Sequence, residues 1–342
     1  MSTPTAIILD CEGTRLTPGE KRFFADSNPY GFIVFTRNCV DHAQLRALTS
    51  DIKEAVGRAD VPIFIDQEGG RVTRLKPPAF RPCPSAGSLA ALGRDAASAI
   101  YLNARLIAHE LHGLGINADC APVVDLLIPG AHAIVGDRAY GSTPRDVAAL
   151  AGEMARGLMD GGVTPVIKHI PGHGRATVDS HHSLPVVDAP LAQLQQTDFA
   201  AFRALAALPM AMTAHIIYNA IDAARPATAS PEVIRLIRED IGFDGLLMSD
   251  ELTMKALTGS LESRVRGALS AGCDVVMFCN GIVTLSLEEK KAALEVAGAM
   301  SAEAVRRAEQ AHATVQARAH AAQALDVPRA EAQLSALMRH VA

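Results

Sequence analysis

Short apolar segments alternate along this chain with longer stretches that have helical spacing. Eight such segments are rich in Val, Ile, Leu and Phe, and they are residues 6–9, 31–35, 61–65, 116–124, 164–167, 210–215, 245–248 and 274–278. Several are almost continuously apolar, which is typical of strands that are buried on both faces of a parallel sheet. Eight strands with intervening helices over roughly 250 residues predict a single α/β domain, a (β/α)8 TIM barrel.

Two of the intervening stretches carry clear helix signals. Thr143 is a cap candidate followed by Pro144 at the first helical position, and Gly161 and Gly162 end the amphipathic run that follows. Apolar residues at helical spacing between residues 45 and 56 indicate another helix after the second apolar segment. Both helices lie where a barrel requires them, between consecutive strands.

A doubly wound open sheet is the competing architecture. Such a sheet usually has a glycine-rich nucleotide turn after its first strand, and no GxGxxG pattern follows Leu9. After Asn280 the sequence is rich in alanine, glutamate and arginine. We therefore expect residues 1–300 to form a catalytic barrel, and residues 301–342 to form a C-terminal helical segment that covers it within the same domain.

The composition narrows the class of protein. The chain has 342 residues and a formal net charge of -5, so it has no basic field that would attract nucleic acid. Its N-terminus lacks the pattern of a secretory signal, and no apolar run is long enough to span a membrane. We expect a cytoplasmic protein, a monomer, with neither nucleic acid nor membrane as a partner.

The cysteine pattern agrees with a reducing compartment. No CxxC pair occurs, and the six cysteines lie in or beside apolar runs, where we expect small buried side chains without chemistry. They are Cys11, Cys39, Cys83, Cys120, Cys273 and Cys279.

Polar residues follow the predicted strands at their C-terminal ends. Barrel enzymes place their chemistry at this end of the barrel. The polar residues at these positions are Asp10, Asp66, Asp125, Lys168, His169, His215, Ser249, Asp250, Glu251 and Asn280. As a set they predict an active site at the C-terminal face.

Residues 168–181 concentrate ionisable side chains. This segment holds one lysine, one arginine, three histidines and an aspartate among glycines and a proline that indicate a loop. Groups at this density can surround one reacting atom and shift the pKa values of one another. The segment is therefore the strongest candidate for catalytic residues.

Five motifs occur in a fixed order between about Ile7 and Asn280. They read DQEGGRV at 66–72, GDR at 136–138, KHIPGHG at 168–174, DSH at 179–181 and SDELTM at 249–254. In this order, and at strand ends, they resemble glycoside hydrolase family 3, specifically its single-domain NagZ-type β-N-acetylglucosaminidases. The resemblance implies an enzyme of cell-wall recycling that removes terminal β-linked N-acetylglucosamine from muropeptides containing 1,6-anhydro-N-acetylmuramic acid.

The resemblance also implies catalytic roles. Retaining glycoside hydrolysis needs a carboxylate at the anomeric carbon and a proton donor for the leaving oxygen. Asp250 matches the family nucleophile, His181 its acid/base and Asp179 the residue that orients the histidine. Histidine suits this role because it exchanges protons near neutral pH. The simpler interpretations are that Asp250 caps a helix beginning near Leu252 and that His181 belongs to an exposed polar loop.

The loop from 174 to 185 is expected to close over bound sugar. Two neighbours of the predicted catalytic groups are given no role: His182, and Glu251, which stands where the family usually has aspartate.

Sugar hydroxyls require charged and bidentate partners. The predicted substrate-binding residues are one acceptor, Asp66, and four donors, Arg74, Arg138, Lys168 and His169. Glu68 and Arg71 are expected either to form an ion pair beneath the site or to bind ligand. His173 is expected to organise its loop, and His215 to lie either in the pocket or in the core.

Other functions compete with this one. A metal-dependent barrel hydrolase could use His169, His173, Asp179 and His181 as zinc ligands, but no HxH or HExxH pattern is present. A catalytically silent barrel that binds sugar or a partner protein would be expected to lack the strand-end carboxylate or the loop pair, and both are present. Within the family, a β-glucosidase or a phosphorylase is the nearest alternative. We expect no metal and no cofactor.

Overall fold

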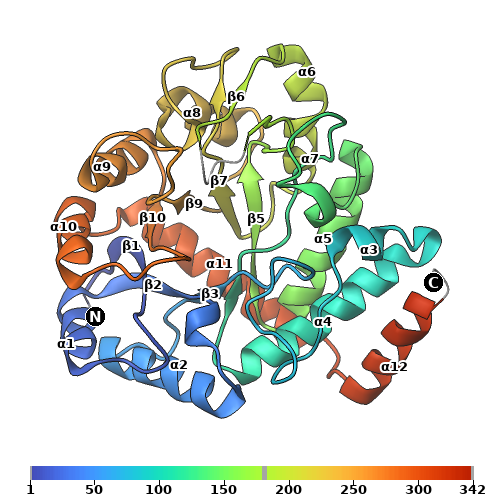
Figure 1. The fold of residues 1–342 in the computed structure, drawn as a ribbon, viewed down its shortest axis with the longest axis horizontal. Coiled ribbons are helices and arrows are strands. Elements are labelled where there is room, and N and C mark those ends of the chain that lie inside the picture. The colour runs from blue at the N-terminus through green and yellow to red at the C-terminus, as the bar shows by residue number, and fades with distance from the viewer. Residues whose placement is uncertain (1, 179–182, 340–342) are drawn as a thin grey trace.

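Eight parallel strands close into a barrel in the order β1-β10-β9-β7-β5-β4-β3-β2 (Figure 1). The computed structural model describes residues 2–178 and 183–339. The strands are β1 (Thr5–Asp10), β2 (Pro29–Val34), β3 (Ile63–Ile65), β4 (Ala118–Asp119), β5 (Thr164–Ile170), β7 (Met210–Thr213), β9 (Leu246–Glu251) and β10 (Val275–Phe278). Each predicted strand overlaps one of them, so the TIM-barrel prediction is confirmed and the open doubly wound sheet is wrong.

Helices surround the barrel and follow its strands (Figure 1). They are α1 (Pro18–Ser27), α2 (His42–Val56), α3 (Ala86–Ala90), α4 (Ala96–Gly113), α5 (Pro144–Asp160), α6 (Leu191–Gln196), α7 (Asp198–Ala204), α8 (Pro231–Glu239), α9 (Leu261–Ala271) and α10 (Leu287–Ala297). The chain ends with α11 (Ala302–Ala321) and α12 (Val327–Met338). A small parallel pair, β6 (Val186–Val187) and β8 (Ile217–Tyr218), lies outside the barrel sheet.

Local sequence signals set where the helices begin. At α5 the side chain of Thr143 accepts a hydrogen bond from the backbone N–H of Asp146, and Pro144 occupies the first helical position, as predicted. At α1, Thr17 and Glu20 cap each other's backbone N–H in a capping box. These caps satisfy N–H groups that have no partner within the helix, so each helix starts directly after its loop.

Successive strand residues point into two separate cores. In β1, Ile7 and Leu9 pack outward in the core shared with the helices, whereas Ala6 and Ile8 pack inside the barrel. The alternation follows from the period of two in a strand. It explains why the predicted strands are continuously apolar: both of their faces are buried.

Helix α11 packs against the N-terminal end of the barrel. Met300 and, within α11, Ala304 and Ala311 belong to the same buried cluster as the barrel interior. The C-terminal ends of the strands therefore face the opposite side, and they position the site described below. The boundary at residue 300 stays a prediction.

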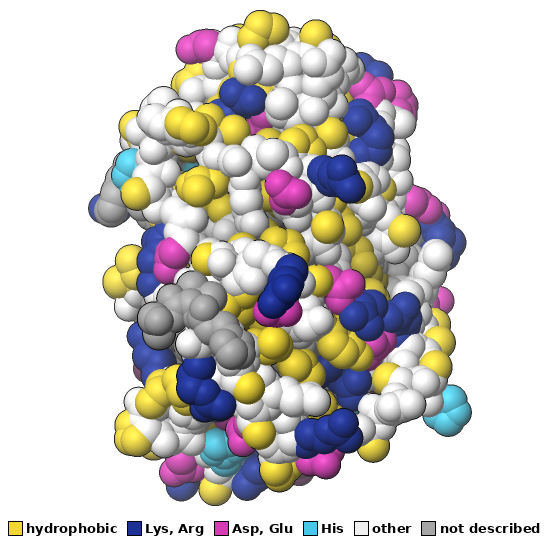
Figure 2. Space-filling view, turned by 90° about the vertical axis from the view of Figure 1, so that its right-hand side faces the viewer, with side chains coloured by type: hydrophobic (Ala, Val, Ile, Leu, Met, Phe, Trp, Pro, Cys, Tyr) yellow, Lys and Arg dark blue, Asp and Glu magenta, His cyan; other side chains and the backbone are white. Residues whose placement is uncertain are grey.

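The outer surface carries charges of both signs. On the face shown in Figure 2, Lys and Arg side chains alternate with Asp, Glu and apolar groups. In the described part of the chain, no helix has the length and apolar character needed to cross a membrane. The six cysteines are free, and four of them are buried.

Candidate active site

A cavity of about 540 Å³ opens at the C-terminal ends of the barrel strands. This volume is in the ordinary range for small-molecule sites. Its polar and charged lining residues include Asp66, Glu68, Arg71, Arg74, Arg138, Lys168, His169, His173, Asp250, Glu251, Thr253, Lys255 and Asn280. Residues from the ends of β3, β5, β9 and β10 thus meet in one pocket with Arg138 from the long loop after β4, as the strand-end pattern predicts.

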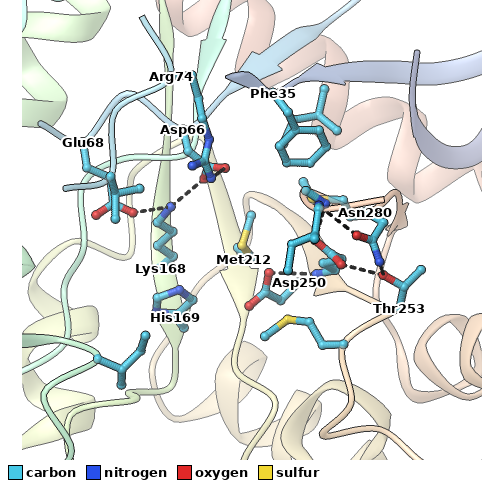
Figure 3. Close-up of a pocket in the computed structure, with 18 of the residues that line it drawn as sticks. Phe35, Asp66, Glu68, Arg74, Lys168, His169, Met212, Asp250, Thr253 and Asn280 are labelled. Atoms are coloured by element: carbon cyan, nitrogen blue, oxygen red, sulfur yellow. Dashed lines mark hydrogen bonds and ion pairs between the residues drawn. The ribbon is translucent and has the colours of Figure 1, made fainter. Parts of the chain in front are cut away.

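One wall of the pocket is a buried cluster of alternating charges. The Nζ of Lys168 lies 2.9 Å from Oδ1 of Asp66 and 2.7 Å from Oε1 of Glu68. Arg74 donates to Oδ2 of Asp66 at 2.8 Å. Arg138 donates to both oxygens of Glu68 at 2.7 and 2.8 Å, in the bidentate geometry that a guanidinium favours. Figure 3 shows Asp66, Glu68, Arg74 and Lys168 together on this wall.

The paired charges in this wall hold its carboxylates ionised. Burial alone would raise the pKa of Asp66, but the ammonium of Lys168 and the guanidinium of Arg74 outweigh it and lower the pKa below its usual range. Burial is likewise outweighed by Arg138 and Lys168 at Glu68, whose pKa falls to about 2. The pKa of Lys168 is raised, since Asp66 and Glu68 outweigh its own burial. Two carboxylates and their cations therefore stay charged at neutral pH.

Glu68 makes the stability of the fold depend on acid pH. Its carboxyl binds a proton with a pKa of about 2 in the folded state and near the ordinary 4.5 when unfolded. The unfolded state therefore takes up more protons between pH 5 and 2, and the stabilisation from Glu68, about 3 kcal/mol, is lost as pH falls through that window. We expect Glu68→Gln to be less stable than wild type at pH 7, and the difference to shrink toward pH 2.

Urea unfolding of the two proteins at several pH values measures this difference. Glu54→Gln, at an exposed position on α2, is the control and should track the wild type. A constant gap between wild type and Glu68→Gln over the whole range would contradict the expectation.

Asp125 organises the two histidines at the end of β5. Its Oδ2 lies 2.6 Å from Nδ1 of His169, and its Oδ1 accepts backbone N–H groups of His169 and His173 at 3.2 and 2.6 Å. Burial opposes ionisation of Asp125, but His169 outweighs it and the pKa falls to about 2. Burial, reinforced by His169, lowers the pKa of His173 to about 4, so His173 is neutral at pH 7. The ionised Asp125 fixes the ring of His169 at the pocket.

Asp250 reaches the pocket from the end of β9. Its Oδ1 accepts the backbone N–H of Glu251 at 2.7 Å, and the next helix, α9, is capped by Ser260. The alternative in which Asp250 caps a helix beginning near Leu252 is therefore wrong. In Figure 3, Asp250 lies between the charged wall and the side formed by Asn280 and Thr253.

Glu251 connects the end of β9 to the loop after β10. Its Oε1 accepts from Thr253 Oγ1 at 2.5 Å, and its Oε2 accepts from the backbone N–H of Gly281 at 3.3 Å. The side chain of Asn280 in turn donates to Thr253 Oγ1 at 2.9 Å. Glu251 therefore contributes to the pocket wall, a role that the sequence did not indicate.

The contacts of Glu68 and Arg71 decide between the two interpretations of these residues. Glu68 and Arg71 do not pair: Glu68 binds Arg138 and Lys168, whereas Arg71 binds Asp137 at 2.8 Å. The ion-pair prediction was wrong because sequence neighbours in a loop need not face each other.

His215 is a core residue outside the pocket lining. Its Nδ1 lies 2.7 Å from Thr228 Oγ1 and its Nε2 lies 3.0 Å from the carbonyl oxygen of Glu251. Asp10, another strand-end candidate, is also buried, and it pairs with Lys290 and Arg37.

The predicted substrate-binding residues all line this one pocket, together with Asp250. They are Asp66, Arg74, Arg138, Lys168 and His169. Asp179 and His181 lie outside the described residues. Several apolar lining residues were not predicted, among them Phe35, Met212 and Met254. Phe35 ends the second apolar run, so its position beside the C-terminal face was the available signal.

The fold and the pocket define a class of protein: a (β/α)8-barrel enzyme whose site lies at the C-terminal ends of its strands. The glycosyl hydrolase family 3 N-terminal domain matches residues 14–315. The chain belongs to glycoside hydrolase family 3, and it is a glycoside hydrolase.

Relatives of known name and structure agree with this membership. A β-hexosaminidase of Alkalilimnicola ehrlichii is 41% identical over 283 residues, covering 80% of each chain. A β-hexosaminidase of Bordetella avium is 37% identical over 285 residues, covering 81% of each. The structure of NagZ from Neisseria gonorrhoeae in complex with N-trifluoroacetyl-D-glucosamine is 31% identical, with a TM-score of 0.84 and 98% of each chain covered.

Proposed function

We propose that this enzyme is a retaining exo-β-N-acetylglucosaminidase, that is, a β-N-acetylhexosaminidase that hydrolyses terminal non-reducing β-linked N-acetylglucosamine. The observation that carries the proposal is the position of Asp250: a carboxylate at the end of β9, in one pocket with the charged wall of Asp66, Arg74 and Lys168. The curated relatives named β-hexosaminidase support the amino-sugar specificity. So does the N-acylated glucosamine bound to the Neisseria gonorrhoeae protein.

In this proposal Asp250 attacks the anomeric carbon while His181 protonates the departing glycosidic oxygen. The bond from carbon to the aglycone breaks, and an ester forms between the sugar and Asp250. The same histidine then takes a proton from water, which displaces the carboxylate and releases the sugar with its original configuration. Asp179 orients the ring of His181 and stabilises its charged form.

The terminal sugar is held by the buried wall. Asp66 accepts from sugar hydroxyls, and Arg74, Arg138, Lys168 and His169 donate. Because Lys168 bridges Asp66 and Glu68, and Asp125 fixes His169, these groups are already positioned before the sugar arrives. Such preorganisation avoids the cost of ordering side chains during binding.

We also propose the setting in which this reaction occurs. The expected substrates are muropeptides that carry N-acetylglucosamine linked to 1,6-anhydro-N-acetylmuramic acid, in peptidoglycan recycling in the cytoplasm. The enzyme acts as a monomer without a cofactor. The substrate, the recycling role and the compartment come from the resemblance of the five motifs to the NagZ-type enzymes.

One assay separates the activities. The protein is incubated with an aryl β-N-acetylglucosaminide and the matching β-glucoside, with and without phosphate, and the products are identified. We expect free N-acetylglucosamine of β configuration from the first substrate only, with no sugar phosphate. Cleavage of the glucoside at an equal rate would favour a β-glucosidase, and a sugar 1-phosphate would favour a phosphorylase.

The acid/base proposal has a test of its own. His181→Ala should lower kcat/KM more for a natural disaccharide than for an activated aryl glycoside, because a good leaving group needs little protonation. The comparison requires kcat/KM of the wild type and of the variant for each of the two substrates. An equal loss on both substrates would count against His181 as the acid.

A metal-dependent hydrolase is the competing class. Among the residues that the structure describes, no group of three or more His, Cys, Asp or Glu is placed to hold a metal ion. His169 and His173 are both held by Asp125 instead. We expect a chelator to leave the activity unchanged, and loss of activity that is restored by zinc would favour the metal-dependent mechanism.

A further inference from the structure

The rim of the active-site pocket has an exposed edge on the side of β9 and β10. Four lining residues are exposed: Arg71, Lys255, Gly281 and Ile282. Of these, Lys255, Gly281 and Ile282 come from the loops that follow β9 and β10. Ile282 is 87% exposed, the highest value among the large apolar side chains that the structure describes. With the neighbouring Val283, which is also exposed, it places apolar surface beside the polar pocket, where a ligand that fills the pocket would meet it.

Lys255 differs in its ion pairing from the other lysine and the arginines of the pocket. Arg71 pairs with Asp137, Arg74 with Asp66, and Lys168 with Asp66 and Glu68, as Arg138 does with Glu68. Lys255 has no ion pair or hydrogen bond within residues 2–178 and 183–339. Its ammonium is therefore available to an anion that enters the pocket mouth.

Lys255 is positioned to contact the aglycone of the substrate. This step rests on the proposed function, in which the hydroxyls of the terminal sugar meet the buried wall and its anomeric carbon meets Asp250. The rest of the molecule, the aglycone, then has to leave through the pocket mouth. Lys255 lies five residues beyond Asp250, and Ile282 follows Asn280 at the end of β10, so the exposed rim meets the aglycone first.

We propose that Lys255 and Ile282 form an aglycone subsite for substrates whose aglycone carries a carboxylate. The ammonium of Lys255 pairs with the carboxylate, and the side chain of Ile282 contacts the apolar part of the aglycone beside it. Glu251 supports this arrangement by binding Gly281 and Thr253, which holds the loop that carries Ile282 against the loop that carries Lys255.

The test compares one anionic and one neutral aglycone on the same glycosidic bond. The substrates are N-acetylglucosaminyl-β-1,4-N-acetylmuramic acid, which has a lactyl carboxylate, and its methyl ester. We expect Lys255→Gln to lower kcat/KM about three- to five-fold for the acid, the size of an exposed ion pair, and to leave the ester within two-fold. Lys255→Glu should lower it further for the acid alone, with a loss that diminishes at high salt because screening weakens repulsion.

Two matched variants complete the experiment. Lys291→Gln removes an exposed lysine on α10, away from the pocket, and should change neither substrate. Ile282→Ser should lower kcat/KM equally for the acid and the ester, since its contact is apolar. Equal effects of Lys255→Gln on acid and ester would overturn the subsite. If the wild type cleaved neither disaccharide nor an aryl β-N-acetylglucosaminide, the proposed function itself would fail, and the subsite with it.

Discussion

Replacing Asp250 with alanine is expected to lower kcat for an aryl β-N-acetylglucosaminide by on the order of 10⁴-fold or more, because no covalent intermediate forms without the carboxylate. The backbone around Asp250 is held by the β9 ladder to β7 and β10. The variant should therefore fold normally, with an unchanged midpoint of urea unfolding. Steady-state kinetics on a sensitive aryl substrate measures the loss.

Two further measurements make the assignment of Asp250 specific. Glu251→Gln changes the adjacent carboxylate, and we expect a much smaller loss because Glu251 holds a loop rather than the reacting carbon. Azide added to Asp250→Ala should restore turnover and give the α-glycosyl azide, since a single displacement inverts the anomeric carbon. Full activity of Asp250→Ala, or azide rescue at another carboxylate variant instead, would refute the nucleophile.

Replacing Lys168 with methionine is expected to damage both stability and binding. Lys168 is buried and is shared by Asp66 and Glu68, so its loss leaves two carboxylates with one cation each. We expect a loss of about 3 kcal/mol in the free energy of unfolding, at the low end for a broken buried pair, because Arg74 and Arg138 still neutralise the carboxylates. KM should rise as well, since Asp66 is no longer held toward the sugar.

Urea unfolding and steady-state kinetics on the same preparation measure these two effects. Lys291→Met, an exposed position on α10, is the control for loss of a lysine and should behave as wild type. An unfolding free energy for Lys168→Met within about 0.5 kcal/mol of wild type, the size usual for surface changes, would show that the cluster contributes little to the fold.

The barrel was predictable because its strands are buried on both faces. Each strand is then a short, continuous apolar run. Its short length, and the helices on either side, distinguish it from a buried helix. The fourth strand shows the limit of this signal. The apolar run covers residues 116–124, but the continuous ladder of β4 includes only Ala118 and Asp119. Beyond Asp119 the backbone still contacts β5, through the isolated Val123–Lys168 bridge, and a pattern of apolar residues does not distinguish such a bridge from a ladder.

Which strand-end residues line the pocket was predictable, and how they pair was not. Asp66, Lys168 and Asp250 stand at strand ends, where chain order alone brings them to one face of the barrel. The partner of Glu68 is Arg138, which is 70 residues away, and a sequence gives no distance between two loops. Lys255 and Ile282 follow recognisable strands, but their exposure depends on loop conformation, for which periodicity gives no signal.

Because apolar side chains fill the interior of the barrel beneath the pocket, the pocket opens only at its mouth. Substrate and products therefore pass through the same opening. In the proposed reaction the monosaccharide lies at the bottom of the pocket, and the aglycone fragment lies between it and the mouth. In the proposed mechanism, the fragment with the new reducing end must therefore depart before water reaches the ester and before the monosaccharide leaves. Free N-acetylglucosamine should accordingly compete with substrate for the whole pocket. The aglycone fragment, which is released first, should compete only at the pocket mouth.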